Sequence, residues 1–163
     1  MSRHLALIIG YAVVLVLFTA ASVTAAQHGT AEEAKAMLEK AVVAVKEDKA
    51  KALDMFNKGE GGFKDRDLYV SCANISDGIV TAHPHGNMGK QLRDILDKKG
   101  NPHGQEIMQN ANEGTIKEVT FWWPRPGTDK PLEKTIFYTK VGDQRGGTIF
   151  RGFGLLPARH ERR

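Results

Sequence analysis

The chain has 163 residues, 41% of them hydrophobic, and a formal net charge of +4. This size allows one domain with one core, so we expect no second catalytic or output domain within these residues. Lysines and arginines (23) only slightly outnumber aspartates and glutamates (19), and the two signs are interleaved, which argues against a nucleic-acid-binding face. The single cysteine, Cys72, excludes an internal disulfide framework, and its apolar setting predicts a buried thiol rather than a nucleophile.

The N-terminus has the layout of a targeting segment. A short basic start precedes an uncharged apolar run over residues 5–18 and a series of small residues that ends at Ala26. This order is typical of a secretory signal peptide, so we predict that residues 1–26 are cleaved and that the protein is periplasmic or secreted. The alternative is that residues 5–26, which are just long enough to span a bilayer, stay as an N-terminal membrane anchor facing outside the cytoplasm.

A long helix is predicted next. Thr30–Glu33 has the form of a capping box, which places the helix start at Ala31. Apolar residues then recur at helical spacing as far as Phe56, and the glycine that follows Lys58 provides a stop, so the pattern predicts one amphipathic helix over residues 31–58. A helix of this length exceeds what a small core covers, and we expect part of it to project or to form a homodimer. The alternative is an ordinary core helix with a frayed end.

The rest of the chain alternates short β-branched and aromatic runs with turn residues. Two of the runs flank an Asp-Gly turn and predict a hairpin, and two short helices are expected between residues 92 and 111. The five predicted strands cover residues 68–73, 79–83, 116–123, 132–141 and 148–156. This order predicts an α+β fold in which an antiparallel five-stranded sheet has the long helix on one face and the helical insertion on the other. The core would span residues 66–156, and residues 157–163 would form a basic tail.

A series of short motifs occurs in a fixed order over about residues 30–143. The motifs are Asp67–Val70, Ser76–Gly78, His83-Pro84, Gly89–Leu92, Asp97–Pro102, Trp123–Pro126, Lys134 and Tyr138. Together they resemble the single Cache domains, which are PAS-like extracytoplasmic sensor modules of chemoreceptors, sensor kinases and small free-standing periplasmic proteins. The resemblance implies a domain over residues 27–156, a pocket between the sheet and the insertion, and a small ligand such as a short carboxylate. After Asp143 the sequence departs from the closing strand of that family.

A small anion in a partly dry pocket needs several converging donors on an apolar wall. Lys134 and Tyr138 are four residues apart on one predicted strand and therefore share a face, so we predict that they hold a carboxylate. The alternative for Lys134 is the solvent-exposed side of the strand. His83 is expected to form a hydrogen bond at the pocket mouth, and Tyr69, in a matched motif, is a further candidate.

The adjacent Trp122 and Trp123 must point to opposite faces of their strand. We expect one of them in the core under the long helix and the other in the pocket wall, where it would contact the ligand.

Other chemistries find little support in the sequence. His83 and His85 lie close together, but a third ligand at a recognised spacing is missing, so we predict no metal site, and the absence of a phosphate-binding glycine loop predicts no cofactor. The rival hypothesis is an enzyme that pairs His83 with Asp77 or Asp94 in acid–base chemistry, but no nucleophile or acid–base pair stands at a recognised spacing. We therefore predict a non-enzymatic, small-molecule-binding module that acts as a scavenger, as a buffer or as a co-receptor for a membrane sensor protein. A membrane-tethered interaction protein that uses the long helix is the alternative.

Overall fold

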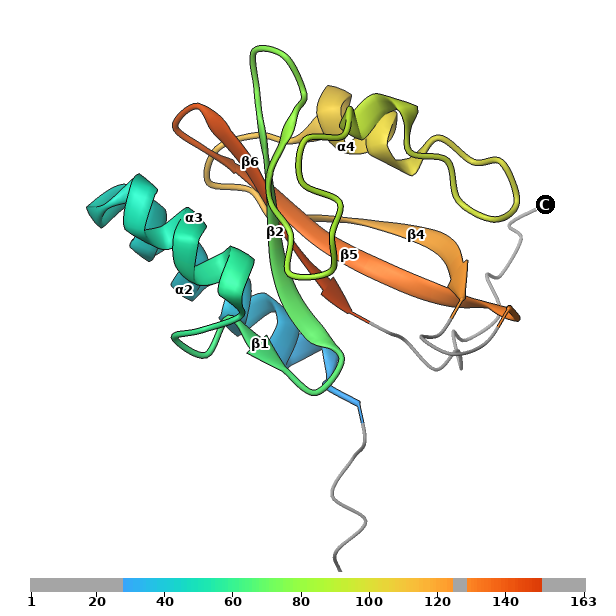
Figure 1. Cartoon of the computed structure of the whole chain (residues 1–163), viewed down its shortest axis with the longest axis horizontal. Helices are drawn as coiled ribbons and strands as arrows, with labels where there is room; N and C mark the ends of the chain where they lie inside the picture. Colours follow the sequence, from blue (N-terminus) through green and yellow to red (C-terminus); the bar gives the residue numbers. More distant parts are fainter. Residues whose placement is uncertain (1–27, 125–128, 151–163) are drawn as a thin grey trace, which may run out of the picture.

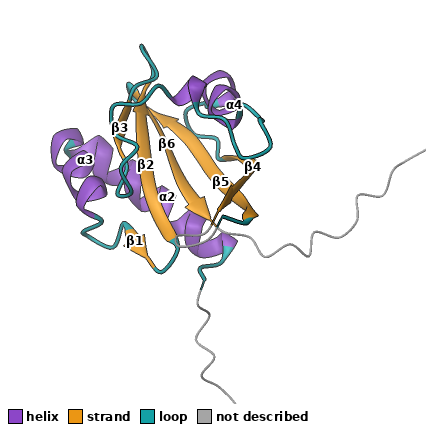
Figure 2. Cartoon of the chain, turned by 45° about the vertical axis from the view of Figure 1, so that its right-hand side comes forward, coloured by secondary structure: helices purple, strands orange, loops and turns teal. Residues whose placement is uncertain are grey.

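The computed structural model of the protein describes residues 28–124 and 129–150, and for residues 145–150 it describes the backbone only. Two N-terminal helices cover one face of an antiparallel sheet, and a third helix with its flanking loops covers the other (Figures 1 and 2). This is the predicted α+β arrangement. The predicted signal peptide (1–26), the basic tail (157–163) and the end of the last predicted strand (151–156) lie outside the described residues.

The predicted single helix is in fact two helices, α2 (Ala31–Glu47) and α3 (Lys49–Lys58), so the expectation of one helix over residues 31–58 was wrong. The backbone becomes extended at Asp48 (φ −154°, ψ 96°), whose carboxylate accepts a hydrogen bond of 3.0 Å from the Lys51 N–H. Aspartate is a strong N-cap residue and a poor helix former, so it ends one helix and starts the next. The predicted capping box at Thr30 and the left-handed stop at Gly59 are both confirmed.

The break allows both helices to lie on the sheet. Their buried residues recur along the whole length of the pair and belong to one core with the inward-facing residues of the strands. The helical members of this core are Ala34, Met37, Leu38, Ala41, Val45, Ala52 and Phe56. The argument that an overlong helix must project or pair with a second copy therefore no longer holds.

The described sheet has six strands rather than the predicted five. They are β1 (Lys64–Asp65), β2 (Leu68–Asn74), β3 (Val80–Ala82), β4 (Lys117–Pro124), β5 (Pro131–Val141) and β6 (Gln144–Phe150). The order is β1-β2-β6-β5-β4, with β3 also paired to β2. The additional strand, β1, is a two-residue segment with two charged side chains, which carries no apolar pattern. The strand β6 begins at Gln144, immediately after the turn, and lies in the middle of the sheet between β2 and β5.

The insertion between β3 and β4 contains the 3-10 helix η1 (Leu92–Asp94) and the helix α4 (His103–Asn110), which corresponds to the two short helices predicted there. Alternation along β5 divides the sheet between two cores. Phe137 and Val141 face α2 and α3, whereas Ile136 and Tyr138 face α4. The site described below therefore lies on the α4 face.

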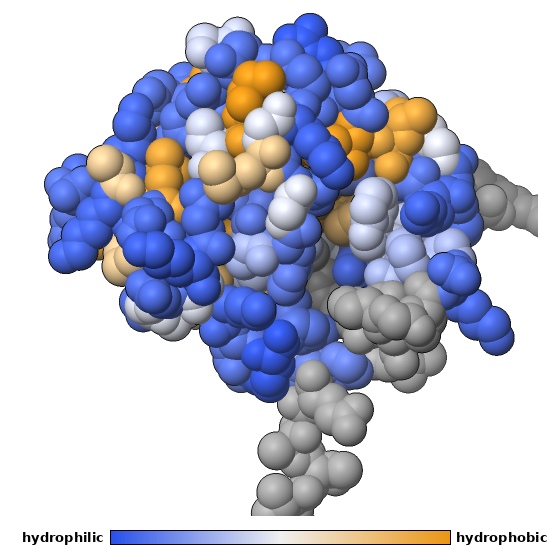
Figure 3. Space-filling model, in the orientation of Figure 1, coloured by the Kyte–Doolittle hydropathy of each residue, from blue (hydrophilic) through white to orange (hydrophobic). Residues whose placement is uncertain are grey.

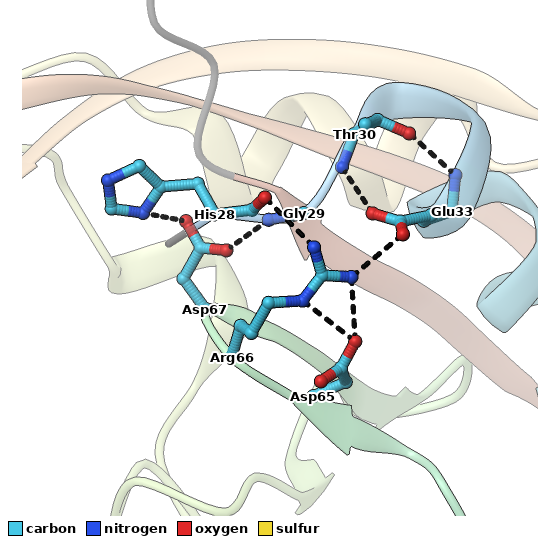
Figure 4. A network of polar contacts seen from close by, with 7 residues as sticks. All are labelled: His28, Gly29, Thr30, Glu33, Asp65, Arg66 and Asp67. Carbon is cyan, nitrogen blue, oxygen red and sulfur yellow. Dashed lines mark hydrogen bonds and ion pairs between the residues drawn. The ribbon is translucent and has the colours of Figure 1, made fainter. Parts of the chain in front are cut away.

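A polar network fixes the segment ahead of α2 to the turn between β1 and β2 (Figure 4). The Asp67 carboxylate accepts a hydrogen bond of 2.7 Å from the Gly29 N–H and lies 3.1 Å from Nδ1 of His28. Arg66, which has a left-handed backbone (φ 53°), donates to the His28 carbonyl at 3.0 Å and pairs with Glu33 at 2.8 Å. The chain thus enters α2 at a fixed position beside β2.

The surface seen in Figure 3 is mainly hydrophilic, and its apolar residues form separate patches. Among the described residues, the large hydrophobic side chains with the greatest exposure are Val43, Met88 and Leu96, each 52% to 55% exposed. Isolated exposed apolar residues of this kind are normal for a folded domain.

Candidate functional site

A cavity lies between the sheet and the helical insertion, on the face opposite α2 and α3. About 70 Å³ of it is open to the centre of a water molecule, and a single water needs roughly 10–15 Å³ by this measure. The space therefore suits a small organic molecule. The lining residues are Tyr69, Ser71, Cys72, Ala73, Val80, His83, Asn87, Leu92, Ile95, His103, Ile107, Phe121, Trp123, Lys134, Ile136 and Tyr138.

Five of the six predicted site residues line this cavity: Tyr69, His83, Trp123, Lys134 and Tyr138. They come from β2, β4, β5 and the residue after β3, so segments far apart in the sequence bring them together. The structure thus places them as a group around one cavity. Whether they contact a ligand stays a prediction.

Trp122 does not line the cavity, and the core under α2 and α3 contains neither tryptophan. The Trp122 ring is half-buried beneath the Lys99 ammonium, whose Nζ lies 3.2 Å from the ring centroid. The expectation that one tryptophan packs under the long helix was wrong because β4 is the edge strand of the sheet, whereas the two helices pack mainly over β2, β3, β5 and β6. Trp123 has the other predicted role, in the pocket wall.

Lys134 and Tyr138 share one face of β5 with Ile136 between them, as predicted. Burial lowers the pKa of the half-buried Lys134, and the charge of Asp67 partly offsets this effect. Tyr138 is only 2% exposed, and burial, followed by the charge of Glu106, raises its pKa. At neutral pH the phenol is therefore a neutral hydrogen-bond donor on the same face of β5 as Lys134.

His83 is held at the pocket wall by several hydrogen bonds. Its N–H donates to Oδ1 of Asn57 on α3 at 2.9 Å, and its Nδ1 accepts from the His85 N–H at 3.1 Å. Burial, and then the nearby cationic side chains, lowers the pKa of His83 to about 4. The imidazole is thus neutral at pH 7. Nε2 lies 3.2 Å from Nδ2 of Asn87, another lining residue.

The two neighbouring histidines take part in an aromatic group at the pocket wall. The Tyr69 ring meets both imidazoles edge to face, with centroid distances of 5.2 Å to His83 and 4.7 Å to His85. The two imidazole centroids are 6.1 Å apart. Over residues 28–124 and 129–150, no group of three or more His, Cys, Asp or Glu side chains is placed to hold a metal ion.

Cys72 is 4% exposed, as its apolar setting predicted, and it lies between the helical core and the cavity. Burial raises the pKa of its thiol to about 12. Since the thiolate is the nucleophilic form, this cysteine is chemically inert at neutral pH.

Two residues that matter for the pocket were missed by sequence reasoning. One is His103, the first residue of α4, which is 6% exposed and stacks on Phe121 with a centroid distance of 4.5 Å and an interplanar angle of 16°. A histidine at the start of a short helix carries no signal that distinguishes a pocket residue from a surface one.

The other is Asp97, which does not line the cavity but holds the loop after η1 in place by hydrogen bonds. Its carboxylate is buried and accepts hydrogen bonds of 2.8 to 2.9 Å from the backbone N–H groups of Lys99, Asn101 and Trp122 and from the side chain of Asn101. Burial alone would raise the pKa of Asp97, but these donors outweigh burial and hold the pKa well below its usual range. The loop after η1 is thereby fixed to β4 next to Trp123.

None of the described helices is both long enough and apolar enough to cross a membrane. None of the curated proteins matches the sequence.

Several solved structures share the fold. A methyl-accepting chemotaxis protein from Vibrio parahaemolyticus is 22% identical, with a TM-score of 0.58, and the match covers 74% of this chain and 86% of that one. A periplasmic sensor domain of a chemotaxis protein is 19% identical, with a TM-score of 0.55 and coverage of 74% and 88%. A Cache chemosensory domain solved for its carboxylic acid recognition is 16% identical, with a TM-score of 0.59 and coverage of 74% and 91%.

The family model for Single Cache domain 2 matches residues 13–153. The match extends ten residues past Asp143, where the motif resemblance ended, in agreement with the central position of β6. Because this family model matches most of the chain, the chain belongs to the single Cache family of extracytoplasmic sensor domains.

Proposed function

We propose that this protein binds a small carboxylate, or a similar anionic metabolite, in the pocket between the sheet and α4. The observation that carries the proposal is the charge of the wall: the lining contains one ammonium group, on Lys134, and no aspartate or glutamate. A half-buried cation is costly to keep without a counter-charge, and a bound anion supplies one. The carboxylic acid recognised by one of the solved neighbours belongs to the same ligand class.

Neutral donors complete the proposed recognition. The Tyr138 hydroxyl lies on the same face of β5 as Lys134, and the neutral His83 imidazole lines the same cavity. A carboxylate accepts hydrogen bonds at both oxygens, so an ammonium and a phenol can hold its two ends. The apolar remainder of the wall, including Ile107, Phe121 and Trp123, would cover the ligand's carbon skeleton.

We infer that the protein binds its ligand without transforming it. The pocket cysteine has a raised pKa, and within the described residues the hydrogen bonds of His83 go to Asn57, His85 and Asn87 rather than to a carboxylate. The protein would act outside the cytoplasm after cleavage of residues 1–26 and would pass its ligand status to a membrane sensor. In the alternative arrangement residues 5–26 stay as an anchor, and the mass of the exported protein distinguishes the two.

Binding is tested with residues 27–163, by thermal shift and calorimetry against short carboxylates, amino acids and amines. A ligand at 100 times its dissociation constant adds about 2.7 kcal/mol to the free energy of unfolding, which raises the melting temperature by several degrees. We expect this response from carboxylates and not from amines.

The matched variants are Lys134→Gln and Lys130→Gln, the latter in an exposed lysine just before β5. A hydrogen bond to a charged group contributes about 1.5–3 kcal/mol, so Lys134→Gln should weaken carboxylate binding at least tenfold while Lys130→Gln leaves it unchanged. Equal affinity in the two variants, or a preference for amines in the unchanged protein, would show that the proposal is wrong.

A further inference from the structure

His103 is a buried imidazole with an unused hydrogen-bonding atom in the pocket region. The residue is 94% buried, its side chain lines the cavity, and its Nδ1 has no hydrogen-bond partner within residues 28–124 and 129–150. Leaving a buried polar atom unpaired costs free energy, so a native structure that does so needs an explanation. A group on a bound ligand would supply the missing partner.

The position of His103 is fixed by its neighbours. Its ring stacks on Phe121, and the next residue, Gly104, approaches η1 so closely that a Cβ there would lie 1.8 Å from the Leu92 carbonyl oxygen. The helix start therefore cannot shift away from η1 without losing this packing. The position of the imidazole at the cavity is therefore set by the packing on Phe121 and η1.

The stacking on Phe121 places His103 near the proposed carboxylate site. Phe121 on β4 is the direct cross-strand partner of Lys134 on β5, and both side chains line the cavity. Directly opposed residues in an antiparallel pair have Cβ atoms about 4.5–5.5 Å apart. A ligand held by Lys134 thus lies beside the ring on which His103 stacks, so one small molecule can reach both.

The second ligand group must suit a neutral imidazole. Burial lowers the pKa of His103, although a hydrogen bond with the Asn101 backbone and the charge of Asp97 act in the opposite direction. A neutral imidazole nitrogen accepts or donates one hydrogen bond according to its tautomer. A hydroxyl group can pair with this nitrogen in either tautomer, because it both donates and accepts. A keto oxygen only accepts, so it pairs with the tautomer in which the nitrogen carries the proton. An ammonium group would add a positive charge near Lys134 in a wall without carboxylates, which disfavours amino acids.

We propose that His103 is a ligand-binding residue and that the ligand is a short carboxylate with a second, uncharged polar group, as in a hydroxy or keto acid. This inference rests on the proposed function, because Lys134 is taken to hold the carboxylate. It goes further in naming a second contact, from α4, and in separating hydroxy and keto acids from simple fatty acids and amino acids.

The test uses propionate, lactate, pyruvate and alanine, which share one carbon skeleton, with the unchanged protein and His103→Phe. Phenylalanine keeps the stacking on Phe121 and removes the polar atoms. We expect lactate or pyruvate to bind the unchanged protein about tenfold more tightly than propionate, and alanine to bind weakest. In His103→Phe this preference should disappear while the affinity for propionate changes by less than about threefold.

Two results would overturn the inference: propionate binding as tightly as lactate and pyruvate, or His103→Phe weakening all the acids alike. If propionate then still depends on Lys134, the proposed function stands and only the role of His103 is wrong; if no carboxylate binds, both fail. Should His103→Phe not fold, the ¹⁵N resonances of the His103 imidazole in the unchanged protein decide. They should shift on addition of lactate or pyruvate and not of propionate, and the absence of that difference contradicts the inference.

Discussion

The buried carboxylate of Asp97 allows a quantitative test of how the pocket wall is held. Each of its two oxygens accepts two hydrogen bonds, from Lys99 and Asn101 on one side and from Asn101 and Trp122 on the other. In Asp97→Asn an NH₂ group replaces one oxygen, so two buried donors lose their acceptor. At about 1–3 kcal/mol for each unsatisfied group, we expect a loss of about 3 kcal/mol, or a melting temperature lower by about 10 °C.

The pH dependence of this loss provides a second check. The pKa of Asp97 is lower in the folded protein than in the unfolded chain, so its stabilising contribution is complete above about pH 4, the unfolded value, and is lost as the pH falls towards the folded value. Urea unfolding followed by tryptophan fluorescence at pH 7, 5 and 3 measures the difference between the two proteins, with the exposed Asp94→Asn as control. A difference below about 1 kcal/mol at pH 7, or one that is as large at pH 3, would refute this reasoning.

Two further predictions concern the packing of α4 and the charge of the pocket. Gly104→Ala forces a Cβ against the Leu92 carbonyl, so it should lower the free energy of unfolding, measured in urea, by about 1–3 kcal/mol. Gln105→Ala, at an exposed position of the same helix, should be neutral. Equal stability of the two variants would contradict the close contact. The second prediction concerns His83, whose pKa is about 4 in the folded protein and near 6.5 in the unfolded chain. Between these pH values the unfolded chain binds a proton that the folded protein does not. The free energy of unfolding should therefore fall by up to about 3 kcal/mol as the pH drops from 6.5 to 4. His83→Gln should flatten this part of the stability curve, and an unchanged slope would show that folding does not lower the pKa of His83.

The sequence predicted the elements of the fold better than their boundaries. Apolar periodicity, the capping box at Thr30 and the turn residues gave the helical start, the strands and the helical insertion in the right order. The break at Asp48 was missed because α2 and α3 bury their apolar faces against the same sheet, so the apolar spacing continues across the break. The strand β1 was missed because two charged residues carry no pattern, although β2 fixes them by pairing.

The candidate site was predicted where strand geometry determines it. Alternation along β5 was enough to place Lys134 and Tyr138 on one face, and the structure adds that this face is the one under α4. Tertiary packing determined the rest: no local signal indicates which tryptophan faces the cavity, or that His103 is brought onto Phe121. Residues whose roles depend on contacts between the insertion and β4 are beyond what a single sequence specifies.

The charge of Lys134 has to be judged together with the network of Figure 4. The charge of Asp67 partly offsets the lowering of the Lys134 pKa by burial, but the Asp67 oxygens are already engaged by the Gly29 N–H and by His28. Within the described part of the chain, no carboxylate lies within ion-pair distance of the Lys134 ammonium. The lysine therefore faces the cavity with much of its charge uncompensated, and an anion there would gain an attraction that a neutral or cationic molecule of the same size would not.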